Sequence, residues 1–183
     1  MLFTGKNIRL RPERKEDVAK LIAIRNEEEV LENLSMYLPL QGSVERGEYW
    51  FNEELKEKHT NDVEFVIEKL DGTIIGMCGT MDTNWKNSYT TVWIFLGGPE
   101  QRSKGYGSEA LGLLVDYIFN EMNLNRVRLF VFEFNKRAVK SYEKCGFKVE
   151  GTLRQELYRK GKYNDVYQMA ILKREYDAMR RGE

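Results

Sequence analysis

Apolar and polar positions alternate in seven short runs, and each run predicts a β-strand because successive side chains of a strand point to opposite faces. The alternation is clearest where Val, Ile, Phe and Tyr predominate, as in residues 126–132. The seven predicted strands cover residues 8–11, 64–69, 73–80, 89–96, 126–132, 151–158 and 165–172.

Helical spacing of apolar residues predicts four helices between these strands, at residues 17–26, 43–55, 110–119 and 136–144. Ser43 stands at the start of the second helix and Asn135 directly before the fourth, and both residue types cap helix N-termini. Gly146 follows the fourth helix, where a glycine readily ends it.

The order of these elements predicts an α/β fold with a mixed sheet, in the sequence β-α-α-β-β-β-α-β-α-β-β. Asp71-Gly72 is typical of a tight hairpin turn, so the strands on either side of it are expected to be antiparallel. The helix at 110–119 separates two strands in the manner of a βαβ unit. We find no linker or repeat, and we expect a single domain over residues 1–183.

Composition narrows the class of protein. The chain has 183 residues, of which 42% are hydrophobic and 32% charged, and no apolar run approaches the roughly 20 residues needed to span a bilayer. Basic and acidic residues number 29 each, which argues against a nucleic-acid binder. Cys78 and Cys145 lack metal-ligand spacing, and no secretion signal is visible, so we expect free thiols in the cytoplasm. The single histidine, His59, is expected in a surface loop.

The candidate chemistry lies in the turn after the strand at 89–96. A basic, glycine-containing turn that leads from a strand into a helix directs backbone N–H donors and the helix dipole at one point, which suits a phosphate group. The turn contains Arg102, Ser103, Lys104, Gly105, Tyr106, Gly107 and Ser108.

The turn alone has three interpretations. Residues 105–110 match the dinucleotide pattern G-x-G-x-x-A, with Glu133 at a fitting distance, although eight residues separate Leu96 from Gly105. In the second interpretation the turn is only a tight connector and binds no ligand. In the third interpretation the turn is a longer basic loop that surrounds a pyrophosphate.

The third interpretation brings in a family. Arg102 to Gly107 resembles motif A of the GCN5-related N-acetyltransferases, Arg/Gln-x-x-Gly-x-Gly/Ala. The segments at 135–138 and 141–147 are similar to the family pattern Asn-x-x-Ala…Tyr-x-x-x-Gly-Phe. The segments at 8–17, 151–154 and 161–165 resemble the ribosomal-protein and spermidine acetyltransferase subgroups.

The resemblance implies a mostly antiparallel sheet flanked by helices, with acetyl-coenzyme A as cosubstrate, no metal, and direct acetyl transfer to a primary amine. It assigns Tyr142 as the acid that protonates the departing thiolate, and Asn135 as both helix cap and coenzyme ligand. The coenzyme-binding residues implied are Ile94, Phe95, Leu96, Arg102, Ser103, Lys104, Gly105, Tyr106, Gly107, Ser108, Asn135, Lys136 and Ala138.

The chain departs from the family at three points. Thr91 stands where many relatives carry a glutamate base, and a hydroxyl is no base at neutral pH. Glu32, Asp82 and Glu133 remain open as alternatives. Ser103 replaces a frequent glycine, and an additional glycine pair occupies positions 97 and 98.

The acceptor is left open between a polyamine, a protein N-terminus and another small amine. Acidic residues at 27–29 and 32 suit a cationic acceptor, but an ordinary solvated helix face and connector explains them without one. We name Glu28, Glu32 and Trp85 as candidate substrate contacts. A noncatalytic coenzyme-binding module is the rival function, and the resemblance is compatible with a homodimer.

Overall fold

The computed structural model describes residues 3–54 and 61–182, which divide into two compact units. Unit 1 comprises Met1–Met81 and Trp93–Leu114, and unit 2 comprises Asp82–Val92 and Val115–Glu183. Each unit has an apolar cluster of its own. Two predictions concern positions outside the described residues: the end of the second predicted helix at residue 55, and the surface loop at His59.

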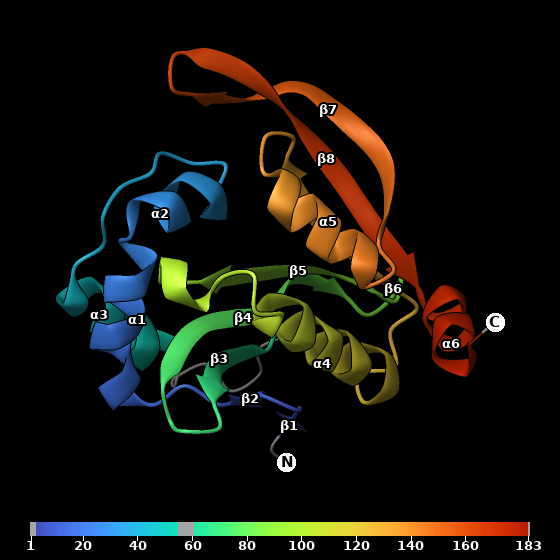
Figure 1. Ribbon diagram of the computed structural model, residues 1–183, viewed down its shortest axis with the longest axis horizontal. Coiled ribbons are helices and arrows are strands. Elements are labelled where there is room, and N and C mark those ends of the chain that lie inside the picture. The colour runs from blue at the N-terminus through green and yellow to red at the C-terminus, as the bar shows by residue number, and fades with distance from the viewer. Residues whose placement is uncertain (1–2, 55–60, 183) are drawn as a thin grey trace. The chain divides into compact units, whose positions relative to one another are not determined.

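Unit 1 combines the N-terminal strands with three helices. Its elements are β1 (Phe3–Thr4), β2 (Ile8–Arg11), α1 (Val18–Arg25), α2 (Glu28–Leu34), α3 (Val44–Glu54), β3 (Glu64–Lys69) and most of β4 (Ile74–Asn84). Helices α1 and α3 lie side by side (Figure 1). Leu21 of α1 packs on Val66 and Met77, which places an apolar face of α1 against the strands.

Unit 2 is built around a long hairpin. Its elements are part of β5 (Tyr89–Leu96), β6 (Arg126–Phe132), α5 (Lys136–Lys144), β7 (Lys148–Arg159), β8 (Lys162–Leu172) and α6 (Lys173–Arg181). Strands β7 and β8 run together as the orange and red ribbons of Figure 1. Leu157 of β7, Val166 of β8 and Phe132 at the end of β6 form the core cluster of this unit.

The eight strands are hydrogen-bonded in the order β1-β2-β3-β4-β5-β6-β8-β7. Strand β5 pairs with β6 in parallel, with Thr91 opposite Arg128, whereas β2–β3, β3–β4, β6–β8 and β7–β8 are antiparallel. The α4 helix (Tyr106–Asn120) connects β5 to β6. This confirms the predicted mixed, mostly antiparallel α/β fold and its βαβ unit.

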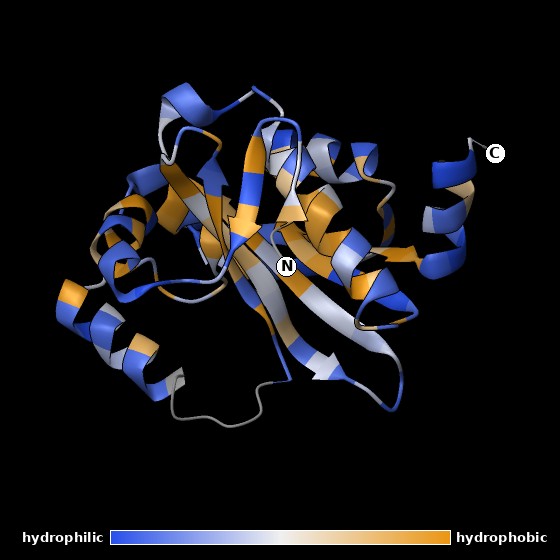
Figure 2. Ribbon diagram, turned by 90° about the horizontal axis from the view of Figure 1, so that it is seen from below, coloured by the Kyte–Doolittle hydropathy of each residue, from blue (hydrophilic) through white to orange (hydrophobic). Residues whose placement is uncertain are grey.

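Three short elements escaped the sequence prediction: β1, α2 and α6. Helix α2 carries one buried residue, Val30, and α6 carries one, Tyr176, so neither shows a wide apolar stripe. Figure 2 shows α6, beside the C-terminal label, mainly in the hydrophilic colour. Within the part of the chain that is described, no helix is both long and apolar enough to cross a membrane.

Candidate functional site

The glycine turn folds into a shape that presents backbone donors. After β5 ends at Leu96, a short 3-10 turn (Pro99–Gln101) leads into Ser103 and Gly105, whose φ angles are +59° and +85°. A turn that contains left-handed residues can direct successive N–H groups to one point, and such a concave nest binds anions. Residues 103–105 are exposed, so the nest is open to solvent.

Helix α4 begins at Tyr106, directly after the nest and four residues before its predicted start. The first N–H groups of a helix have no partner within it, and the helix dipole places partial positive charge there. A Cβ on Gly107 would lie 3.1 Å from Leu96 Cδ1, so glycine lets the helix start close to β5. The turn and helix together therefore suit a pyrophosphate.

The residues predicted to hold the pantetheine arm, Ile94, Phe95 and Leu96, are half-buried on β5. The rings of Trp93 and Phe95 stack 6.1 Å apart and pack on the core cluster of unit 1. Gly76 of β4 lies so close to β5 that a Cβ would be 2.1 Å from the Phe95 carbonyl oxygen. The side chains serve packing, which leaves backbone groups as the polar contacts available to a ligand.

Arg102 has protein partners. Its Nη1 donates to Glu29 Oε2, and its Nη2 lies 3.9 Å from Glu27 Oε2. Glu27 Oε2 also accepts a hydrogen bond of 2.7 Å from the N–H of Gly98. Sequence reasoning treated these carboxylates as acceptor contacts and missed their contact with the turn, because the partners are 73 positions apart.

The second part of the predicted site is helix α5 in unit 2. The Asn135 side chain accepts a hydrogen bond of 3.2 Å from the N–H of Ala138, which confirms its prediction as a helix cap. Lys136 is exposed, with its Nζ 5.8 Å from the ring centroid of Tyr167. The helix ends at Lys144, and Gly146 follows with a φ of +89°, as its residue type predicted.

Tyr142 lies on α5 and is half-buried, with its ring centroid 6.3 Å from that of Phe147. Burial, with a smaller contribution from the neighbouring Cys145, raises the pKa of the Tyr142 phenol to about 12. The phenol is therefore protonated throughout the neutral and moderately alkaline range, the state that an acid needs. Cys145 is partly buried and Cys78 is buried, and both are free thiols, as the sequence predicted.

Thr91 is buried and its hydroxyl is engaged. Arg128 Nε donates a 2.9 Å hydrogen bond to Thr91 Oγ1, while the guanidinium stacks 4.6 Å from the Tyr89 ring centroid. A hydroxyl beside a guanidinium has no tendency to take up a proton. Of the three carboxylates left open as alternative general bases, Asp82 is exposed, and Glu32 and Glu133 are half-buried.

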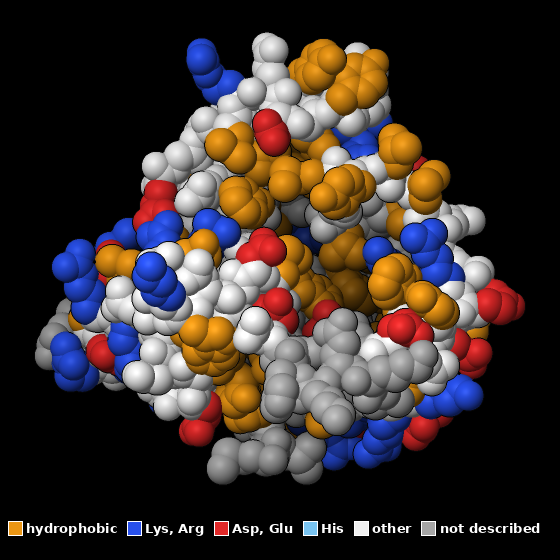
Figure 3. Space-filling model, turned by 180° about the vertical axis from the view of Figure 1, so that it is seen from behind, with side chains coloured by type: hydrophobic (Ala, Val, Ile, Leu, Met, Phe, Trp, Pro, Cys, Tyr) orange, Lys and Arg blue, Asp and Glu red, His pale blue; other side chains and the backbone are white. Residues whose placement is uncertain are grey.

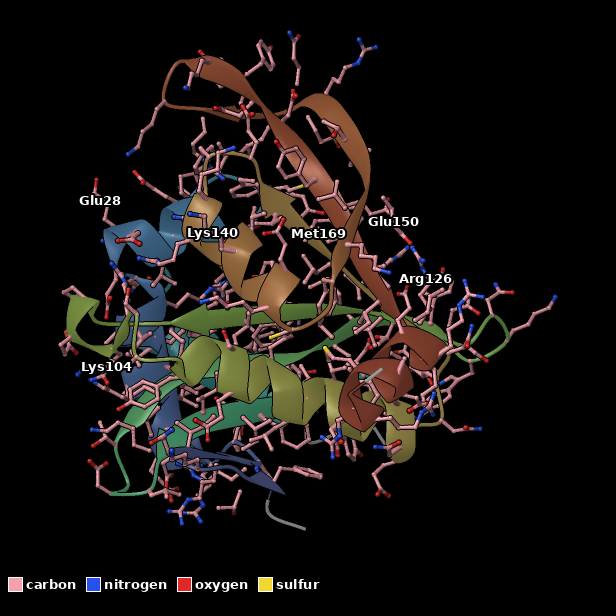
Figure 4. The ribbon with its side chains drawn as sticks, turned by 45° about the vertical axis from the view of Figure 1, so that its right-hand side comes forward. Glu28, Lys104, Arg126, Lys140, Glu150 and Met169 are labelled. Atoms are coloured by element: carbon pink, nitrogen blue, oxygen red, sulfur yellow. The ribbon has the colours of Figure 1, made fainter. Side chains whose placement is uncertain are left out.

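The candidate acceptor contacts are accessible to different degrees. Figure 4 labels Glu28 on α2, where its side chain is exposed, and Lys104 in the turn. Glu32 is half-buried, and Trp85 of unit 2 is 50% exposed. Hydrophobic side chains are frequent on the surface (Figure 3), and in unit 1 several follow α2, including Tyr37 and Leu38 at 85% and 78% exposure.

In residues 3–54 and 61–182, no group of three or more His, Cys, Asp or Glu side chains could hold a metal ion.

Comparison with known proteins decides the family. The model of the acetyltransferase (GNAT) domain matches residues 7–148. The chain belongs to the GNAT acetyltransferase family. Spermidine N(1)-acetyltransferase of Vibrio cholerae is 34% identical over 140 residues, which cover 70% of this chain and 80% of that protein. The Escherichia coli K12 enzyme of the same name is 29% identical, covering 94% and 90%.

Solved structures agree with this GNAT assignment. The crystal structure of spermidine N-acetyltransferase from Vibrio cholerae in complex with CoA and spermine superposes with a TM-score of 0.83 at 27% identity, covering 92% of this chain and 97% of that one. This GNAT protein is thus an acetyl-CoA-dependent N-acetyltransferase that acts on an amine, as the sequence predicted.

Proposed function

We propose that this GNAT protein transfers the acetyl group of acetyl-CoA directly to a terminal primary amine of a polyamine such as spermidine. The observation that supports the donor side is the exposed nest at Ser103–Gly105 ahead of α4. The acceptor side is supported by the two relatives named spermidine N(1)-acetyltransferase and by the neighbouring complex with CoA and spermine.

The proposed donor site uses backbone donors more than side chains. The N–H groups of residues 103–108 bind the pyrophosphate, and exposed Lys104 adds positive charge at the same turn. Backbone groups of Ile94, Phe95 and Leu96 bind the pantetheine arm, and an N–H there polarises the thioester carbonyl. For Asn135, Lys136 and Ala138, at the start of α5 in unit 2, contacts with the coenzyme stay a prediction from the family resemblance.

The proposed reaction is a direct attack. The neutral amine nitrogen bonds to the acetyl carbon, the carbon–sulfur bond breaks, and the Tyr142 phenol protonates the leaving thiolate. The proton lost by the amine leaves through solvent, because Thr91 provides no base at the family position. The phenol is then reprotonated from solvent.

For the acceptor, we propose that Glu28 and Glu32 of α2 attract the polyamine cation. A contact of Trp85, which is 50% exposed in unit 2, with the acceptor stays a prediction from the sequence. Glu28 is exposed on α2, so its carboxylate is accessible to a cation. Such an attraction is electrostatic, so raising the ionic strength is expected to raise the KM for spermidine. A rise in salt that left this KM unchanged would contradict the role of the two carboxylates.

The test is a comparison of acceptors at saturating acetyl-CoA, with release of the free thiol followed spectrophotometrically. Spermidine, spermine, N-terminal peptides of ribosomal proteins, aminoglycosides and amino sugars are compared by kcat/KM. We expect the kcat/KM of the polyamines to exceed that of the other amine classes by about tenfold or more, which corresponds to about 1.4 kcal/mol of selectivity. A peptide or amino sugar at the head of the series would overturn the polyamine assignment.

Calorimetry with acetyl-CoA separates catalysis from binding. Binding without thiol release for any amine would favour a noncatalytic coenzyme-binding module, and binding of NAD in place of acetyl-CoA would restore the dinucleotide interpretation.

We further propose that the protein acts in the cytoplasm, where acetyl-CoA is made and used. We also propose that it forms a homodimer, and sedimentation equilibrium tests this oligomeric state.

A further inference from the structure

The turn that precedes α4 is fastened at two points by carboxylates from the segment around α2. At its start, the N–H of Gly98 donates to Glu27 Oε2 at 2.7 Å. At its centre, Arg102 donates to Glu29 and lies 3.9 Å from Glu27. All four residues belong to unit 1. The two contacts hold the beginning and the middle of the turn against the same short helix.

The glycine pair before the turn is shaped for this contact. A Cβ on Gly97 would lie 2.5 Å from Ile24 Cγ2 and 2.7 Å from Glu27 Oε1, so only glycine leaves room for the Glu27 carboxylate. Gly98 adopts a φ of +70°, a conformation that side-chain-bearing residues rarely adopt. The additional glycines at 97 and 98 are thereby explained: they allow Glu27 to reach the backbone of the turn.

The guanidinium of Arg102 is committed to this contact. The Arg102 side chain is only 16% exposed, both of its terminal nitrogens face carboxylates, and its Nε is buried without a hydrogen-bond partner among the described residues. Neighbouring Lys104 is exposed by contrast. A guanidinium already placed between two carboxylates carries little net attraction for an anion.

We infer that Glu27, Glu29 and Arg102 are positioning residues for the donor, and that they hold the turn in the conformation whose backbone N–H groups bind the pyrophosphate. This inference rests on the proposed function, because it takes the turn as the coenzyme site. It assigns Glu27 and Glu29 to the donor side of the reaction, and leaves Glu28 and Glu32 to the acceptor side.

The decisive variant is Glu29→Gln, with the KM for acetyl-CoA and for spermidine measured separately. We expect the acetyl-CoA KM to rise about tenfold, the cost of a lost charge-assisted hydrogen bond, while kcat and the spermidine KM stay within about twofold. The sign is informative, because removing a negative charge beside an anionic coenzyme would by itself lower this KM. Glu16→Gln is the control: it removes the same charge from an exposed position of unit 1, where the side chain lies 4.0 Å from Arg14, and its acetyl-CoA KM should not rise.

Two other outcomes would overturn the inference. A lower acetyl-CoA KM in Glu29→Gln would mean that Glu29 competes with the pyrophosphate for Arg102, and a change confined to the spermidine KM would make Glu29 an acceptor residue. A double-mutant cycle with Arg102→Gln completes the test: we expect the double variant to resemble either single variant, whereas additive losses would show independent roles. Glu29→Asp should recover part of the loss.

Failure of the inference is distinguishable from failure of the proposed function. If the wild-type protein neither binds acetyl-CoA nor acetylates spermidine, the proposed function fails before any variant is made. If the wild type does both and Glu29→Gln has the acetyl-CoA KM of the wild type, only the positioning role fails. Thermal unfolding of each variant without ligand verifies that the fold is retained.

Discussion

At the scale of single residues, environment decides what each ionisable group can do. Burial raises the pKa of Tyr142 to about 12, so its phenol keeps its proton at neutral pH. Thr91, which stands at the family position of the base, is buried and accepts a hydrogen bond from Arg128. Acid chemistry therefore has a candidate on α5, and base chemistry has none at the expected position.

Tyr142→Phe should lower kcat by about 10²-fold, because a positioned acid contributes that much to proton transfer, with little change in acetyl-CoA affinity. The measurement is steady-state kinetics alongside calorimetry. Tyr158→Phe is the control, since Tyr158 is 60% exposed on the β7–β8 hairpin. A kcat for Tyr142→Phe equal to that of the wild type would exclude the acid role.

The pH profile tests the same assignment. A raised pKa keeps the phenol protonated at every pH below it, so no loss of kcat from its ionisation is expected up to about pH 10, where an ordinary tyrosine would be half ionised. The kcat should be followed from about pH 7 to about pH 10 at saturating substrates. A Tyr142-dependent decline centred below pH 10, absent from Tyr142→Phe, would contradict the raised pKa.

A buried ion-pair network in unit 1 sets the acid stability. Arg11 donates to both oxygens of Asp17 at 2.6 and 2.9 Å, and its Nε donates to Glu68. Burial alone would raise the pKa of the two carboxyls, but their hydrogen bonds with Arg11 lower them overall. Each carboxylate thus stabilises the fold above its ordinary pKa, 3.8 for Asp17 and 4.5 for Glu68, and this contribution is lost as the pH falls further.

Asp17→Asn should lower the free energy of unfolding by about 3 kcal/mol at neutral pH, because it leaves the buried guanidinium short of a partner. The difference from the wild type should shrink as the pH falls below about 3.8, because protons then bind the unfolded chain in preference to the folded carboxylate, whose pKa is lowered. Urea unfolding at several pH values measures both effects. Glu16→Gln, one position away with its side chain 72% exposed, should change little; a difference independent of pH would refute the electrostatic explanation.

At the scale of elements, the turn before α4 is strained at one position. Ser103 has a φ of +59°, which costs about 1 kcal/mol for a residue with a Cβ. The frequent glycine at this place in the family pattern therefore has a conformational reason. The strain is confined to the nest, since Gly105 adopts a φ of +85° without that cost.

Ser103→Gly is expected to raise the free energy of unfolding by about 0.5 kcal/mol, and the Tm by about 2 °C, because relief of the strained φ outweighs the greater chain entropy of glycine. Differential scanning calorimetry measures the shift. The matched control is Ser103→Ala, which keeps the Cβ and hence the strain. Equal Tm values for the two variants would show that the φ of Ser103 costs nothing.

At the scale of the whole molecule, the boundary between the units falls inside β4, β5 and α4, between residues 81 and 82, 92 and 93, and 114 and 115. Three regular elements thus contribute residues to both units. Because melting of either unit would remove hydrogen bonds from elements that it shares with the other, we propose that the chain is a single domain, as the sequence predicted.

The single-domain proposal predicts one cooperative thermal transition, with equal calorimetric and van't Hoff enthalpies. The transition should shift upward as a whole when acetyl-CoA is added, because the ligand binds only the folded protein. Two separated transitions, of which only one responds to acetyl-CoA, would show that the units unfold independently.

The sequence by itself determined the elements with strong local signals. The strands at 8–11, 64–69, 89–96 and 126–132 and the helix at 136–144 have the predicted bounds, because alternation, an asparagine cap and a terminating glycine are all encoded within a few residues. The family motifs are equally local, so the donor could be inferred before any fold was known.

Only the tertiary structure decided which side chains meet. The pairing of Arg102 with Glu29 spans 73 positions and that of Thr91 with Arg128 spans 37, and neither leaves a mark on local composition. Helix α2 has only seven residues, which is too short to be stable alone, so burial of its Val30 against the rest of the protein stabilises it. Charge and burial at a site are set by neighbours that the chain brings in from a distance, and the chemistry of the turn follows from them.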